Sequence, residues 1–147
     1  MKLSTHIRYG TRLMFELALR KNSGLVLLKD IARNQGLSEK YLSKLIIPLK
    51  SAGLVSSARG FKGGYEISKD PSKVTIKEIL EALEGKISIA ECVYNPQSCC
   101  RSSVCPTRDV WVNLTNVITE FLGQVTLSDV IDNYKNKVEE NVINYSI

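Results

Sequence analysis

Hydrophobic residues recur at helical spacing through most of the chain, and polar caps and glycines separate the periodic segments. A first helix is predicted, with Ser4 or Thr5 as its cap and residues 22–24 as its stop, from the spacing of Ile7, Gly10, Met14, Leu17 and Ala18. A brief second helix is expected from Asp30 to Asn34. These two segments indicate the start of a helical domain.

The third periodic segment begins at Ser38, which stands where an N-cap residue would. Its apolar residues fall at i, i+3, i+4 and i+7, and they are Leu42, Leu45, Ile46 and Leu49. After Gly53, two short β-like runs at 54–57 and 65–68 flank a glycine-rich tip that carries Arg59 and Lys62. Helix, turn, helix and basic hairpin together predict a winged helix-turn-helix, so we expect a mainly α fold with a small β wing.

The second half of the chain contains two capping signatures and a long apolar stripe. Thr75 to Glu78 is a capping box that opens a helix through Leu83, and Ser88 to Glu91 repeats the signature. A long helix is expected from Pro106 or Thr107 to Gly123, and a shorter one capped by Ser128 follows. The apolar stripe of the long helix comprises Val110, Trp111, Leu114, Val117, Ile118, Phe121 and Leu122. One small domain cannot cover so broad a stripe, so we expect a second copy of the chain to cover it in a two-fold dimer.

Charge is divided unevenly between the two halves. Residues 1–73 carry 14 lysines and arginines against 5 acidic residues, a net charge of +9, whereas residues 74–147 carry 6 against 10, a net charge of −4. A basic half is typical of a protein that binds a polyanion. We therefore expect a DNA-binding domain at 1–73, a connecting helix at 74–91, a cysteine loop at 92–105, and dimerisation and C-terminal helices at 106–147.

All four cysteines lie in one short stretch, as Cys92, Cys99, Cys100 and Cys105. The chain shows neither a signal peptide nor an apolar run of transmembrane length, which predicts a cytoplasmic protein that no membrane anchors. In a reducing compartment, clustered thiols indicate a metal, a redox sensor or catalysis rather than structural disulfides. With a single histidine and no phosphate-binding loop, we do not expect an enzyme.

Several sequence segments, which together extend over nearly the whole chain, resemble those of a known family. The segments LSEKYLSKLIIPLKSAGLVSSARGFKGGY and ALEGKISIAEC, followed by CPTRDVW, resemble the Rrf2 family of bacterial transcription regulators, and within it the iron-sulfur cluster regulator (IscR-like) branch. The wing pattern RGxxGGY is much more specific than a helix-turn-helix pattern alone. The resemblance implies a homodimer that binds palindromic promoter DNA.

Candidate DNA-binding residues come from the resemblance and from the position of each side chain on the predicted helix. The resemblance places contacts at Ser38, Lys40, Ser43, Lys44 and, on the wing, Arg59. We add Tyr41 and Lys62 as candidate DNA contacts from the chemistry of their side chains alone, although packing explains Tyr41 equally well. Relatives can carry a carboxylate where Ser43 stands, so the class of operator stays open.

The resemblance implies three cluster-binding cysteines, and we assign Cys92, Cys99 and Cys105 to these positions. Cys100 is the alternative middle ligand, the fourth ligand or a spare thiol. The best-known relatives have a histidine ligand where this chain has Arg108, and others borrow an acidic residue where it has Arg8. The remaining candidates for the fourth ligand are Cys100, Glu91, Asp109 and His6. A two-iron cluster is favoured over a four-iron cluster.

Two regulatory hypotheses follow. In the first, an iron-sulfur cluster controls operator binding by a dimeric transcription regulator. In the second, a regulator of cysteine or redox metabolism senses through thiol oxidation or a partner protein, without a cluster. Zinc bound by the four thiols is a further alternative.

Overall fold

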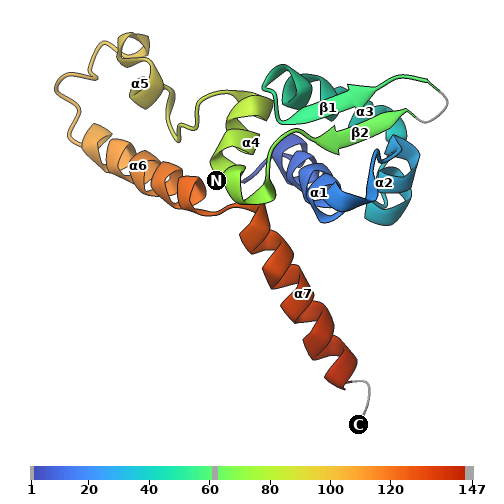
Figure 1. Ribbon diagram of the computed structural model, residues 1–147. Coiled ribbons are helices and arrows are strands. Elements are labelled where there is room, and N and C mark those ends of the chain that lie inside the picture. The colour runs from blue at the N-terminus through green and yellow to red at the C-terminus, as the bar shows by residue number, and fades with distance from the viewer. Residues whose placement is uncertain (1, 61–62, 145–147) are drawn as a thin grey trace.

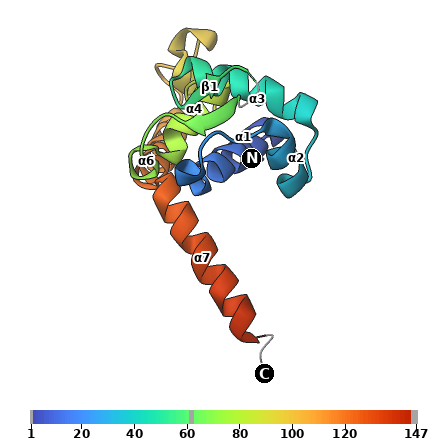
Figure 2. The same ribbon diagram turned by 45° about the vertical axis from the view of Figure 1, so that its right-hand side comes forward.

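The structure, a computed structural model, describes residues 2–60 and 63–144, with side chains as far as residue 141. In chain order its elements are α1 (Thr5–Leu19), α2 (Leu28–Gln35), α3 (Glu39–Ser51), β1 (Val55–Ala58), β2 (Gly64–Ile67), α4 (Ile76–Glu84), α5 (Glu91–Tyr94), α6 (Arg108–Gln124) and α7 (Leu127–Asn144). Helices α1 to α4 and the hairpin form one body, from which α7 projects (Figure 1 and Figure 2). The predicted fold class, mainly α with a small β wing, is confirmed.

One hydrophobic core joins the first four helices. On α1, Leu13, Met14 and Leu17 are at most 1% exposed, and they belong to the same buried cluster as the leucines of α3. The predicted apolar face of α3 is confirmed, since Leu42, Leu45, Ile46 and Leu49 are all buried. Burial of each such side chain contributes roughly 1.5–3 kcal/mol, so this core fixes the angle at which α3 meets the body.

The first helices begin and end close to the predicted residues, with two differences. Helix α1 ends at Leu19, short of the predicted stop at residues 22–24, and a separate 3-10 turn follows at Lys21–Ser23. The hydroxyl of Ser4 caps α1 by accepting from the Ile7 N–H (3.1 Å), as predicted. The second helix, α2, begins at Leu28, two residues before the predicted Asp30. Leu28 is buried in the core, and this tertiary contact extends the helix beyond what local capping signals indicate.

The hairpin is antiparallel, and Val55 pairs with Ile67 at its inner end. A third segment joins it, because Val26 donates to and accepts from Tyr65 (2.8 and 2.9 Å). Gly64 must lack a side chain, since a Cβ there would lie 2.8 Å from the Val26 carbonyl oxygen. The wing is therefore held to the body by backbone pairing at its base.

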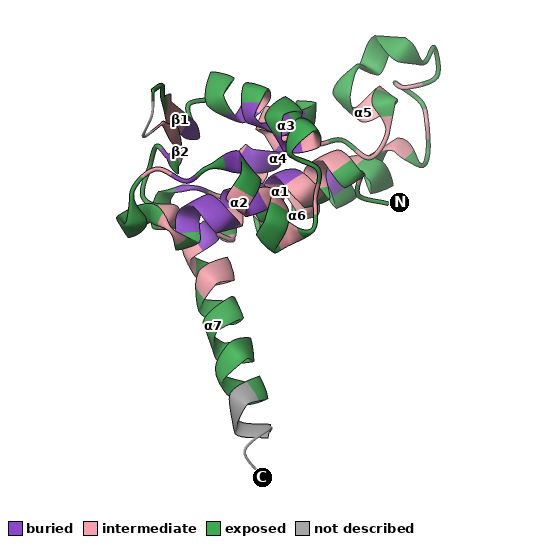
Figure 3. Cartoon of the chain, turned by 90° about the vertical axis from the view of Figure 1, so that its right-hand side faces the viewer, coloured by how far each residue is buried: buried purple, intermediate pink, exposed green. Residues whose placement is uncertain are grey.

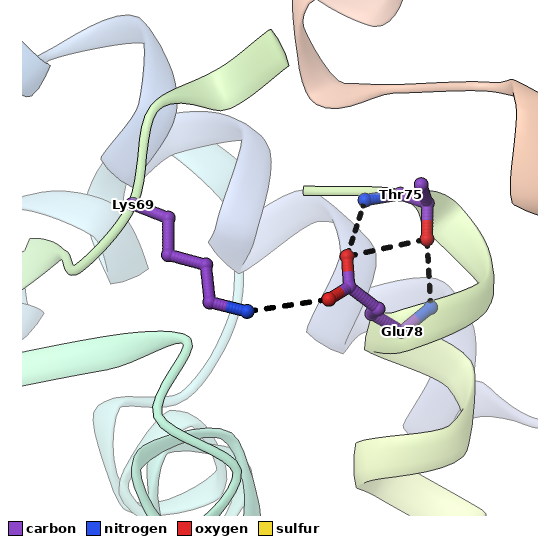
Figure 4. Close-up of polar contacts among 3 residues, drawn as sticks. All are labelled: Lys69, Thr75 and Glu78. Carbon is purple, nitrogen blue, oxygen red and sulfur yellow. Dashed lines mark hydrogen bonds and ion pairs between the residues drawn. The ribbon is translucent and has the colours of Figure 1, made fainter. Parts of the chain in front are cut away.

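The capping box at the start of α4 forms as predicted (Figure 4). The Glu78 carboxylate accepts from the Thr75 N–H (2.9 Å), while the Thr75 hydroxyl accepts from the Glu78 N–H (3.2 Å). Lys69 also pairs with Glu78, at 3.2 Å. Burial disfavours the charged form of Glu78, but these hydrogen bonds outweigh it and lower its pKa. The cap thus joins the end of the wing to the second half of the chain.

Helix α4 packs directly on α1. A Cβ at Gly10 would overlap the side chain of Leu83, so glycine at this position allows the two helices to approach closely. The second predicted capping box is wrong. Ser88 donates its hydroxyl hydrogen to the Ala90 carbonyl (2.7 Å), and the extended backbone at Ala90 delays α5 until Glu91.

The last two helices differ from the prediction in their boundaries. Gly123 does not end α6, which continues to Gln124, and α7 is longer than expected, at 18 residues. Thr126 rather than Ser128 caps α7, through reciprocal bonds with Asp129. A contact with a distant segment explains this shift of the cap. Leu127 is fully buried and its N–H donates to the Val74 carbonyl (2.9 Å), which fixes the turn between α6 and α7.

Burial falls sharply along α7 (Figure 3). Ile131 packs against the core and Phe15 meets Tyr134 edge-to-face, with ring centroids 5.2 Å apart. From residue 132 to residue 141 every side chain is exposed. Beyond Ile131, α7 therefore keeps only surface contacts with the rest of the described chain, among them the contact between Phe15 and Tyr134.

Candidate nucleic-acid interface and cysteine segment

The exposed face of α3 presents most of the predicted DNA-binding residues. The Ser38 hydroxyl caps the helix by accepting from the Tyr41 N–H (3.0 Å). Lys40, Ser43 and Lys44 are exposed, because they lie opposite the buried leucines. Positive side chains and a helix N-terminus on one face suit a phosphate backbone.

Tyr41 has a packing contact within the chain. It is half-buried, and its ring meets the ring of Tyr9 edge-to-face, with centroids 5.9 Å apart. The guanidinium groups of Arg8 and Arg12 each lie 5.7 Å from the centroid of the Tyr9 ring. Packing is thus a role of Tyr41 in the structure, and its aromatic partner Tyr9 is also contacted by two arginines.

The turn before α3 is held from α1. Arg12 donates to both the side-chain and the backbone oxygen of Gln35, at 2.7 and 2.6 Å. Gln35 donates in turn to Glu16 (2.6 Å), whose carboxylate is only 6% exposed and pairs with Arg20 at 3.2 Å. Sequence periodicity did not reveal this network, because its members lie on separate helices.

The wing tip carries Arg59, which is exposed. Gly60 has a φ of +109°, a conformation that residues with a side chain rarely adopt, and its carbonyl accepts from the Gly63 N–H (2.9 Å). At Gly63 a Cβ would lie 2.7 Å from the Ala58 carbonyl oxygen. These constraints account for the glycines of the RGxxGGY pattern. Lys62, the other predicted wing contact, lies outside the described residues.

A groove of about 860 Å³ separates α3 from the wing. It brings Ser43 and Arg59 together from sites distant in sequence, whereas Lys40 and Lys44 lie outside its lining. Lys29 at the start of α2 and Lys50 late in α3 also line it, and sequence analysis missed both. Lys50 stands seven residues after Ser43, a helical spacing that identifies it in retrospect.

The cysteine segment joins α5 to α6. Cys92 lies within α5 and is half-buried, Cys99 and Cys100 are exposed, and Cys105 is half-buried shortly before α6. All four thiols are free. Over the described residues, no three cysteine, histidine, aspartate or glutamate side chains converge closely enough to hold a metal ion.

Two contacts tie this segment to α6. Arg108 donates its Nε–H to the carbonyl of Cys92 (3.3 Å). The thiol of Cys105 lies 3.4 Å from the Thr107 hydroxyl. This hydroxyl can donate to a thiolate, and together with the Thr107 and Arg108 backbone it lowers the pKa of Cys105. These contacts favour the ionised form of the Cys105 thiol.

The donor set fits a soft metal or an iron-sulfur cluster in chemistry and in number. Four accessible thiols lie within fourteen residues of one chain segment. Of the other predicted donors, His6 Nδ1 lies 3.9 Å from Glu84, while Glu91 and Asp109 are exposed. Among the four candidates for the fourth ligand, Cys100 is thus the one that offers a soft thiolate.

Helix α6 presents an apolar face that the described part of its own chain leaves uncovered. Of its residues only Thr115 is buried, and the Thr115 hydroxyl accepts from the Ile89 N–H (3.4 Å). Five members of the predicted stripe are 39–63% exposed, namely Val110, Trp111, Leu114, Val117 and Phe121. Val110, Leu114, Val117 and Phe121 are spaced four, three and four residues apart, which forms a narrow seam of the kind that pairs with another helix.

Comparison with known proteins gives a consistent result. The Rrf2 family model, described as an iron-dependent transcriptional regulator, matches residues 3–133. The chain is 38% identical over 130 residues to the HTH-type transcriptional regulator CymR of Bacillus subtilis (strain 168). The matched region covers 88% of this chain and 89% of the relative. The chain is 35% identical over 133 residues to the HTH-type transcriptional regulator IscR of Escherichia coli O1:K1, covering 90% and 82%.

Solved structures agree with these relatives. The structure of CymR, the global cysteine regulator of B. subtilis, has a TM-score of 0.75 and 37% identity, covering 90% of this chain and 98% of that one. The structure of T. potens IscR has a TM-score of 0.75 and 36% identity, covering 91% and 88%.

The helix-turn-helix, the basic wing and these similarities define a DNA-binding transcription regulator of the winged-helix class. The chain belongs to the Rrf2 family. Over the described residues no helix has both the length and the apolar character required to cross a bilayer. Relatives named CymR and relatives named IscR match this chain almost equally well.

Proposed function

We propose that this regulator acts as a homodimer on palindromic promoter DNA and that an iron-sulfur cluster held by Cys92, Cys99 and Cys105 controls its operator affinity. The observation that carries the proposal is the position of the thiols. All four are free, and they lie on the one segment that links the DNA-binding body to the uncovered apolar helix α6. The relative from T. potens is named IscR, and the family model is described as iron-dependent.

When bound, a cluster of this kind supplies redox-sensitive iron ligated by thiolates. The chain contributes the thiolates, and Thr107 favours the ionised form of Cys105. Arg108 cannot ligate iron, because a guanidinium stays protonated. It instead anchors the backbone of Cys92 to the start of α6. We propose Cys100 as the fourth donor, which would complete a set of four thiolates able to hold a two-iron cluster.

The contacts described above offer a route from the cysteine segment to the DNA-binding face. The segment holds the first turn of α6 through Arg108, α6 packs on α4, and α4 packs on α1 at Gly10. A two-fold dimer through α6 fixes the spacing of the two α3 helices, which must match half-sites roughly 34–36 Å apart. A coupling of about 1–3 kcal/mol, typical of allosteric proteins, changes affinity roughly five- to 150-fold.

A second candidate is a thiol switch without a cluster, and the lowered pKa of Cys105 is the specific observation that favours it. A thiol that ionises readily reacts faster with oxidants. Among the neighbours is a structure of Staphylococcus aureus CymR in an oxidised form, at 34% identity and a TM-score of 0.70. In this version, Cys105 pairs with Cys92 or Cys100 on oxidation.

Anaerobic purification separates the two candidates. We expect brown protein with comparable iron and sulfide contents, and a Cys92→Ala variant that folds and dimerises but has lost its colour. Colourless protein that resists reconstitution with iron and sulfide would eliminate the cluster. Zinc bound in its place, or a disulfide that forms reversibly under peroxide, would then identify the sensor.

A further inference from the structure

Among the described residues of the basic half, Ile47 is the most exposed large hydrophobic residue, at 66% exposure. It lies on the outer face of α3, four residues after Ser43, one turn further along the same helix face. Lysines flank it at Lys44 and Lys50, and both are exposed. An aliphatic side chain left in water on a lysine-rich helix face contributes nothing to the stability of the folded monomer.

The surroundings of Ile47 indicate what covers it. It lines the groove between α3 and the wing, together with Leu27, which is 41% exposed, and the wing arginine Arg59. Three basic residues, Lys29, Lys50 and Arg59, line the same groove against one acidic residue, Glu39, and this excess of positive charge favours a negatively charged partner. The occupant must therefore carry negative charge and also offer a small apolar group at the helix surface.

Duplex DNA offers both features, because its phosphates carry negative charge and its thymine bases carry a methyl group. The major groove presents the C5-methyl group of thymine among polar base edges, and aliphatic side chains recognise it by contact. We propose that Ile47 reads a thymine methyl group in each operator half-site, so that this regulator selects its operator partly through an apolar contact. The inference rests on the proposed binding of α3 in the major groove and adds a determinant of sequence specificity to it.

The test removes a methyl group from the DNA and nothing else. An operator is first selected from a randomised duplex library with the wild-type protein. Each thymine is then replaced by uracil, which keeps the Watson–Crick edge and the O4 acceptor. At one or two positions per half-site, we expect uracil to weaken wild-type binding about fourfold, as for loss of one buried CH₂-sized group, and about 15-fold when both half-sites are changed.

The Ile47→Ala variant completes a double-mutant cycle. It should bind the thymine operator more weakly than wild type, yet bind the thymine and uracil operators equally, with an unchanged salt dependence because no phosphate contact is lost. Leu19→Ala is the matched control, since Leu19 is an exposed aliphatic residue (38%) that lines a different cavity, beside Asp70 and α7. This control should keep the full uracil effect.

The outcomes distinguish the contact from DNA binding itself. Tight, salt-dependent binding that is insensitive to every uracil substitution would overturn the role of Ile47 alone. Equal uracil sensitivity in wild type and Ile47→Ala would also overturn it, because the methyl group would then meet another residue. If selection recovers no operator and the protein binds no duplex, both this inference and the proposed DNA-binding function are overturned.

Discussion

The uncovered face of α6 allows the effect of Phe121→Ala on dimer affinity to be predicted in magnitude. Phe121 is 62% exposed in the single chain. Complete burial of such a side chain contributes about 1.5–3 kcal/mol, so covering its exposed part contributes roughly 1–2 kcal/mol per copy. A two-fold interface buries the residue twice, which gives about 2–4 kcal/mol, or a roughly 30- to 900-fold weaker dimer for the alanine variant.

Sedimentation equilibrium over a range of protein concentrations measures this change. Thermal unfolding of the diluted monomer should hardly change, because Phe121 makes little contact with its own chain. Ile47→Ala removes a comparably exposed residue (66%) from α3 and should leave dimerisation intact. A wild-type protein that stays monomeric, or a Phe121→Ala variant that dimerises as tightly as wild type, would refute the argument that α6 is the interface.

Three further predictions concern single side chains. Arg59→Ala should weaken operator binding and flatten its salt dependence, as titrations at several salt concentrations will show, while iron content stays unchanged; unaltered affinity would exclude the wing contact. In the metal-free protein, Thr107→Val should raise the pKa of Cys105, so that alkylation of this thiol, followed by mass spectrometry, requires a higher pH; identical pH profiles would contradict the hydrogen bond. Because the pKa of Glu78 is lowered in the fold, its charged form stabilises the protein above the ordinary glutamate pKa of roughly 4.3, and that contribution is lost as the pH falls through the folded value. Glu78→Gln should thus unfold more easily at pH 7, by less than about 1 kcal/mol for so exposed a pair, and the gap in acid denaturation should close below roughly pH 4.

The features that the sequence predicted are those that depend on near neighbours. The cap at Ser38 and the capping box from Thr75 to Glu78 each involve residues three positions apart, so the local pattern is sufficient. The buried face of α3 follows from a period of 3.6 residues, and the wing glycines follow from a tight turn. The uncovered stripe of α6 was likewise evident from spacing, since its exposure reflects the absence of an apolar partner within the described chain.

The features that the sequence missed depend on residues far apart in the chain. Burial of Leu28 lengthens α2, and burial of Leu127 moves the cap of α7 from Ser128 to Thr126. No local signal reports either event, because the free energy comes from contacts with distant helices. The same reason explains why only the folded chain shows Arg108 holding the backbone of Cys92.

The sequence by itself thus determined the elements, the family and the identity of the chemical groups: a basic winged helix, four thiols and an apolar helix face. The tertiary structure decided which of these groups share a surface. It placed Arg59 and Ile47 on one groove, although twelve positions separate them in the chain. It also left the four thiols accessible on the segment from α5 to the residues before α6. Capping and periodicity act within one or two helical turns, whereas a common surface requires packing of distant segments, and only the folded core supplies it.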